Sequence, residues 1–194
     1  MSRAARLRRL LLGVGLGLAW AVAAAAEALT VAELERLLRA APAEPAVPFE
    51  ERRESPWLAA PIESRGTLHV GPDRLEKRVT APREETWRLL ADRMEWVGAG
   101  GGAPKQILFR DAPAVGLLAG ALRRVLAGEL LALESAFRIE LRGDPQDWTA
   151  ILKPRSVDAA GQLDHLELRG RGARLQTIVV VERRGERTIT RLDP

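Results

Sequence analysis

Apolar and polar residues alternate through much of the segment from Ala136 to Leu192, with the two-residue period of a strand that buries one face. Phe137, Ile139 and Leu141, for example, alternate with arginine and glutamate residues. Short glycine-containing turns separate these runs, and such connections favour antiparallel pairing because a parallel return needs a long crossover. We expect strands over residues 137–142, 148–153, 162–169, 175–182 and 187–192.

The preceding segment repeats this alternation. Residues 49–57 are extended but strongly charged, which is typical of a solvated edge strand. Residues 98–102 are interpreted as a hairpin tip, because no Lys-Ser/Thr pair follows them as it would in a phosphate-binding loop. Further strands are expected over residues 62–70, 75–80, 87–90, 94–97 and 107–109.

Two amphipathic helices interrupt the strands. The first, over residues 30–41, begins with Thr30 and Glu33 at the spacing of a capping box. The second begins at Pro113, and Asp111 is expected to cap it. We expect its apolar stripe to face the concave side of the sheet; the stripe consists of Val115, Leu118, Leu122 and Val125.

This order of helix, strands, helices and strands predicts a mainly β protein of the α+β class. A single antiparallel sheet of about eight or more strands would curl around helices on its concave side. We expect residues 1–26 to be a secretory signal peptide, because four arginines precede an apolar core and an alanine-rich end. An uncleaved membrane anchor is the alternative. Residues 27–194 are long enough for one domain with a sizeable core.

Removal of the signal peptide changes the charge balance. The full chain has 30 basic and 26 acidic residues, and the four arginines lost with the signal peptide leave a net charge near zero. Nothing in the mature chain therefore suggests a nucleic-acid partner. The sequence contains no cysteine, which excludes a catalytic thiol, a disulfide framework and a lipidated cysteine.

Candidate chemistry is sparse. The two histidines, His69 and His165, alternate with apolar neighbours and are expected on the solvated faces of their strands. No His/Asp/Glu group has metal-ligand spacing, and no serine has a nucleophile-elbow context. We expect no cofactor and no metal. A binding protein for a hydrophobic ligand is therefore favoured over an esterase-like hydrolase.

Two blocks of the sequence resemble the LolA-like family of outer-membrane lipoprotein carriers. The first is residues 66–77 with the following Thr80-Ala81-Pro82, which is similar to the strand–turn–strand hairpin of that family. The second combines Trp148–Arg155 with Gln162–Leu168 and is similar to two later strands. The strand around Val179 and the closing strand continue the resemblance, which covers about residues 27–192.

The resemblance implies an unclosed β-barrel lidded by helices, with an apolar cavity for acyl chains and no enzymatic activity. It implies a periplasmic carrier, expected to be a monomer, that takes acylated lipid or lipoprotein from an inner-membrane donor complex to an outer-membrane acceptor. Gly71 stands where the family has a basic residue, and the chain has few of the aromatic residues that line the cavity in that family, so another acylated lipid is also a candidate cargo. The alternative is a non-enzymatic envelope assembly factor whose barrel is permanently filled and which acts through surface contacts.

Ligand-binding residues are expected on the apolar sides of consecutive strands and on the second helix. Lys77 shares the side of its apolar neighbours, where it either snorkels to water or meets an anionic head group, with Glu76 or Glu95 as its resting partner. The expected lining consists of Leu68, Val70, Leu75, Lys77, Val79, Trp87, Leu89, Met94, Trp96, Leu118 and Leu122.

Overall fold

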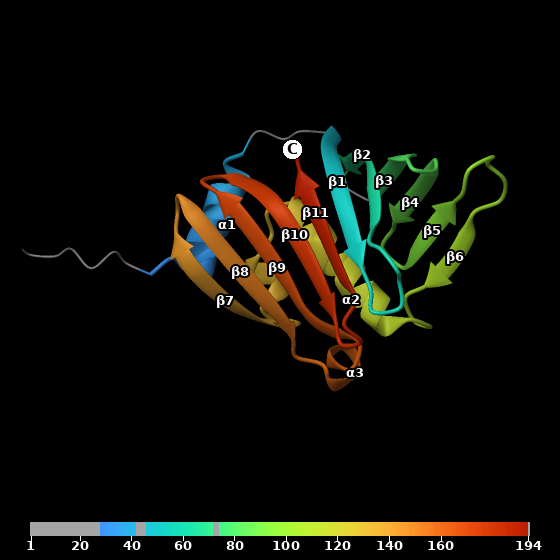
Figure 1. Ribbon diagram of the computed structural model, residues 1–194. Coiled ribbons are helices and arrows are strands. Elements are labelled where there is room, and N and C mark those ends of the chain that lie inside the picture. The colour runs from blue at the N-terminus through green and yellow to red at the C-terminus, as the bar shows by residue number, and fades with distance from the viewer. Residues whose placement is uncertain (1–27, 42–45, 72–73, 194) are drawn as a thin grey trace, which may run out of the picture.

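The computed structural model describes residues 28–41, 46–71 and 74–193; the expected signal peptide lies outside these ranges. One antiparallel sheet of 11 strands dominates the structure (Figure 1). Its spatial order is β6-β5-β4-β3-β2-β1-β11-β10-β9-β8-β7, so the last strand in the sequence pairs with the first. The strands are β1 (Ala46–Glu54), β2 (Ile62–Val70), β3 (Leu75–Ala81), β4 (Glu85–Leu89), β5 (Arg93–Val97), β6 (Lys105–Leu108), β7 (Phe137–Asp144), β8 (Asp147–Pro154), β9 (Leu163–Arg171), β10 (Arg174–Glu182) and β11 (Arg187–Leu192).

The sheet is curled and unclosed, with β6 and β7 as its two edges, which confirms the predicted fold class. The helical elements are α1 (Val31–Arg39), α2 (Pro113–Leu126), a 3-10 turn η1 (Leu131–Leu133) and α3 (Val157–Ala160). Figure 1 shows α1 and α2 on the same side of the sheet, and α3 at the end where β8 passes into β9. The short helix α3 was not predicted, because its four residues are too few to show a helical pattern of apolar positions.

The helices pack on the face of the sheet that carries the apolar alternation. Leu68, Leu152 and Phe137 of the strands belong to one buried cluster with Ala121 and Val125 of α2. Residues paired directly across antiparallel strands point to the same face, so the register extends this inner face along the whole sheet. The core is thus a layer between the concave face of the sheet and the helices.

Two details of α2 differ from the sequence-based expectation. Its N-cap residue is Ala112, without a side-chain hydrogen bond, so Asp111 does not cap it. Val115 is only half buried and is not part of the packed cluster, whereas Ala114 and Ala121 are buried and Leu118 and Leu122 pack against the core.

A hydrogen-bonded carboxylate attaches α1 to the rest of the structure. The capping box of Thr30 and Glu33 forms as expected. Glu35 is 7% exposed, and its Oε2 accepts from the backbone N–H of Leu131 at 2.7 Å. Arg39 donates from Nε to the carbonyl oxygen of Gly128 at 3.1 Å. These bonds fasten α1 across the segment between α2 and η1.

Candidate functional site

An open cleft of about 650 Å³ lies at one end of the inner face. Its volume falls within the range of small-molecule pockets, about 300–1,000 Å³. Its walls come from α1, from the end of α2 and from strands β1, β2, β10 and β11. The lining residues are Leu38, Arg39, Ala41, Val47, Val70, Val125, Leu126, Ala127, Gly128, Ala173, Arg174, Leu175, Leu192 and Asp193.

The apolar wall of this cleft follows from the strand register. Val47 pairs directly with Leu68, and Phe49 pairs with both Leu192 and Gly66, so these side chains share one face. Val70 follows two residues after Leu68 on that face. Apolar side chains converge there because the N-terminal end of β1 lies beside the C-terminal ends of β2 and β11.

The mouth of the cleft is charged. Among the described residues, those of its lining that can ionise are Arg39, Arg174 and Asp193. The guanidinium of Arg39 also forms an ion pair with Glu35, at 3.0 Å between Nη2 and Oε1. A cleft with an apolar wall and charged groups at its entrance suits an amphiphile, whose chain would lie inside and whose head would remain near water.

The strand residues expected to line a cavity all lie on the inner face. Leu68 pairs with Lys77, Val70 with Leu75 and Lys77 with Trp87. The pairing continues from Leu75 to Leu89, from Trp87 to Trp96 and from Leu89 to Met94, while Val79 lies opposite Gly66. The alternation therefore predicted correctly which side chains of these strands lie on the inner face.

Only Val70 of the expected residues lines the cleft itself. Leu68, Leu75 and Val79 are buried in the core cluster. Trp87, Leu89, Leu118 and Leu122 are half buried and pack against that cluster; Met94 and Trp96 of β5 are also half buried but are not part of it. Contact of these other residues with a ligand stays a prediction.

Sequence reasoning did not single out Val47, Leu175 and Leu192 as site residues, although the cleft depends on them. Val47 stands before the charged block of β1, and Leu175 is the second residue of β10. Alternation indicates that these residues are apolar members of strands. Their convergence depends on the pairing of β1 with β11, which joins residues more than a hundred positions apart.

Lys77 forms an ion pair on the inner face, but with neither of the two expected partners. Its Nζ lies 2.6 Å from Oε1 of Glu51, and Oε2 of Glu51 accepts from the hydroxyl of Thr190 at 2.9 Å. The ammonium also lies 4.9 Å from the ring centroid of Phe49. Glu51 reaches Lys77 because β2, the strand between them, carries Ser64 and Gly66 on this face.

The two carboxylates expected to pair with Lys77 lie on the opposite, convex face. Glu95 pairs with Arg93 at 2.8 Å. Glu76 is 3% exposed and accepts from Arg78 at 2.5 Å and from Arg88 at 2.9 Å. Burial alone would raise the pKa of Glu76, but the two arginine hydrogen bonds outweigh it and hold the pKa below its ordinary value.

Glu76→Gln is expected to lower the free energy of unfolding by about 1–3 kcal/mol at neutral pH, because it breaks a buried charge-assisted contact. A carboxylate with a lowered folded-state pKa stabilises fully above its unfolded-state pKa of about 4.3, and this contribution is lost as pH falls through the folded-state value. Urea denaturation at a series of pH values should therefore show the two proteins converging in acid. Glu63→Gln, on an exposed residue 3.8 Å from Arg52, is the matched control and should change little. A difference that persists at low pH would contradict this account.

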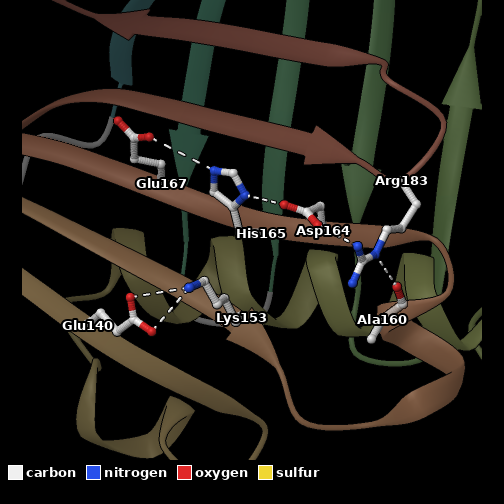
Figure 2. A network of polar contacts seen from close by, with 7 residues as sticks. All are labelled: Glu140, Lys153, Ala160, Asp164, His165, Glu167 and Arg183. Carbon is white, nitrogen blue, oxygen red and sulfur yellow. Dashed lines mark hydrogen bonds and ion pairs between the residues drawn. The ribbon is translucent and has the colours of Figure 1, made fainter.

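A polar network covers the convex face of β7, β8 and β9 (Figure 2). Nδ1 of His165 lies 2.7 Å from Asp164, and Nε2 lies 4.0 Å from Glu167. Asp164 also pairs with Arg183 at 3.0 Å. The hydrogen bond with His165 is the main cause that lowers the pKa of Asp164.

In this arrangement the ring of His165 lies between two carboxylates, with a hydrogen bond between Nδ1 and Asp164 and a longer contact from Nε2 to Glu167. Nearby, Lys153 pairs with Glu140 at 3.1 Å across β8 and β7. Among the described residues, no group of His, Cys, Asp and Glu could hold a metal ion.

A second hollow, of about 370 Å³, lies over β1, β2 and β11 on the convex side. Its charged members include Glu50, Arg52, Glu63, Arg65 and Arg191. Its apolar members are only Ala81, Pro82 and Ile189, and an acyl chain lying there would bury charged groups, so the larger cleft on the inner face is the better binding site.

Comparison with known proteins gives one family and several distant structures. Residues 23–193 match the model of the family described as outer membrane lipoprotein carrier protein LolA-like. No match to a curated protein is found.

Similar solved structures include a LolA superfamily protein from Nitrosomonas europaea, with 10% identity, a TM-score of 0.43, and coverage of 86% of this chain and 93% of that one. They also include MucB, with 12% identity, a TM-score of 0.41, and coverage of 82% of this chain and 54% of that one. MucB in complex with MucA(peri) has 12% identity, a TM-score of 0.36, and coverage of 84% and 51%. The chain thus spans about half the length of the MucB chains.

Proposed function

We propose that this chain, which belongs to the LolA-like family of outer membrane lipoprotein carriers, is a periplasmic carrier that holds acyl chains of a lipid or lipoprotein in the cleft on its inner face. The carrier would receive its cargo from a donor in the inner membrane and deliver it to an acceptor in the outer membrane. No enzymatic step is required for such transfer.

The single observation that carries this proposal is the cleft at the end of the inner face. Val47, Val70, Leu175 and Leu192 form an apolar wall that is open to solvent on one side. Each methylene moved from water onto such a wall contributes about 0.8 kcal/mol, so a chain of ordinary length would be held reversibly. Reversible holding is what a carrier needs.

The proposed location requires export, and the N-terminal pattern of arginines followed by an apolar run supports it. Across the described residues, no helix has the length and hydropathy needed to span a membrane.

Lipid extraction tests the proposed function directly. The full-length gene is expressed in a Gram-negative host, the protein is purified from the periplasm without detergent, and organic extracts are analysed by mass spectrometry. We expect acylated lipid in stoichiometric amount, and displacement of a neutral fluorescent probe such as N-phenyl-1-naphthylamine by added acyl ligands. A protein free of lipid that also fails to bind the probe would overturn the proposal.

An envelope assembly factor is the second candidate, and one surface feature favours it. The connection between β1 and β2 runs Pro56-Trp57-Leu58-Ala59-Ala60-Pro61 without a charge. Trp57 is 78% exposed, and Leu58 and Ile62 beside it are also exposed. An exposed tryptophan among apolar residues is typical of contact surfaces. Under this alternative the same extraction would yield no lipid, and a partner protein would copurify.

A further inference from the structure

Two arginines stand at the mouth of the cleft, although an apolar chain needs neither of them. Arg39 lies at the end of α1 and Arg174 at the start of β10, and both line the cleft. Their side chains are 57% and 74% exposed, so they can meet a ligand from solvent. Guanidinium groups recognise carboxylates and phosphates by charge-assisted hydrogen bonds.

Arg39 is fixed in position by the protein. Its Nε donates to the carbonyl oxygen of Gly128, and its Nη2 pairs with Glu35. Gly128 has φ of +69°, and a Cβ there would lie 3.1 Å from Cγ of Arg39, so the stem of the arginine packs closely against this turn. Because a guanidinium has five N–H donors, these two contacts leave others for a ligand, and a side chain already held in place has less conformational entropy to lose on binding.

Arg174 has a loose partner that an anion can replace. Its Nη1 lies 3.7 Å from Oδ2 of Asp193, and the two side chains are 74% and 60% exposed. An exposed ion pair of this kind contributes at most about 1 kcal/mol. Asp193 therefore occupies the place of an anionic group at the mouth and competes weakly for it.

We propose that the cleft takes an anionic acyl amphiphile, whose chain lies on the wall formed by Val47, Val70 and Leu175 and whose carboxylate or phosphate head binds Arg39 and Arg174. This inference rests on the proposed carrier function and narrows the cargo of the same site to amphiphiles with an anionic head. Asp193 acts as the resting counter-ion that the head group displaces.

The test measures displacement of the neutral probe N-phenyl-1-naphthylamine from the full mature protein by three ligands of equal chain length. These are myristate, myristyl phosphate and neutral monomyristoyl glycerol, so the carboxylate and phosphate forms of the head are separated. We expect the anionic ligands to bind at least about fivefold more tightly than the neutral one, and added salt to narrow the difference.

Two substitutions at the mouth should act in opposite directions. Arg174→Gln should lower the affinity for the two anionic ligands about fivefold and leave the affinity for the neutral ligand unchanged. Asp193→Asn should tighten the anionic ligands, because it removes the competing carboxylate, and asparagine tolerates the backbone φ of 50° found there. Arg184→Gln, on the exposed turn between β10 and β11, makes the same charge change at the opposite end of the strand and is the matched control.

The outcomes separate this inference from the function on which it rests. Equal binding of anionic and neutral ligands, with both mouth variants unchanged, overturns the anionic head group and leaves an acyl carrier. If Arg174→Gln and Arg184→Gln lower the affinity for anionic ligands equally, the proposal is also overturned. The preference would then come from the overall charge of the protein rather than from the arginines at the mouth. Failure of all three ligands and of the probe overturns the carrier function together with this inference.

Discussion

Val70→Glu is expected to abolish acyl-chain uptake while the protein remains folded. Val70 ends β2 on the inner face, is half buried and lines the cleft. A carboxylate at this position would have to lose its hydration whenever an acyl chain lay against the wall. Burial of an unpaired charge costs several kcal/mol, so affinity should fall by at least about a hundredfold.

Displacement of a fluorescent probe measures this loss, and far-UV circular dichroism checks the fold. Ile62→Glu is the matched control, because Ile62 begins the same strand, has its side chain on the same face and is 48% exposed away from the cleft. The control should retain uptake. Undiminished uptake in Val70→Glu, or equal loss in both variants, would place the binding site elsewhere.

Burial distinguishes Val70 from Leu68 as a position for a charged substitution that should block acyl-chain uptake. The sequence alone does not separate the two residues, since both are apolar members of the same alternating strand. Leu68 is only 6% exposed and belongs to the core cluster, so Leu68→Glu would destabilise the protein rather than block the cleft selectively.

Much of the fold could be predicted from the sequence because strand alternation is a local signal. The run Leu75, Lys77, Val79 specifies a face without knowledge of any partner, and the inner face of β2 to β5 follows from it. The same rule predicted that Lys77, although charged, lies on the apolar inner face, and its pairing with Leu68 confirms this. Helix α1 was equally clear, because its capping box is local.

The candidate site could not be predicted in the same way, because distant segments build it. Arg39 lies on α1, which the hydrogen bond between Glu35 and the backbone of Leu131 holds against a segment nearly a hundred residues away, and Val47 meets Leu192 through the pairing of β1 with β11. The partner of Lys77 was missed for the same reason. Sequence neighbours such as Glu76 point to the other face, whereas Glu51 comes from a strand two positions away in the sheet.

Trp148→Ala is expected to lower the free energy of unfolding by about 3–5 kcal/mol, the cost of removing a large buried aromatic side chain. Trp148 is 1% exposed on the inner face of β8, directly opposite Gly170 of β9. A Cβ on Gly170 would lie 2.2 Å from the indole ring, so the ring occupies the space that this glycine leaves. Its Nε1 also donates to the carbonyl oxygen of Gly172 at 2.9 Å, which anchors the turn between β9 and β10.

That turn links the buried indole to the cleft, because it leads directly into Arg174 and Leu175 of the lining. Urea denaturation should give a lower midpoint. The dependence of the unfolding free energy on urea concentration should be unchanged, because the substitution removes packing but leaves the surface exposed on unfolding nearly the same. Trp57→Ala is the matched control: Trp57 is 78% exposed, so its removal should change stability by no more than about 0.5 kcal/mol. Trp148→Ala should in addition weaken probe binding under conditions where it is still folded, because the turn that carries Leu175 loses its anchor. Equal stability of the two tryptophan variants would contradict the central position of this indole in the core.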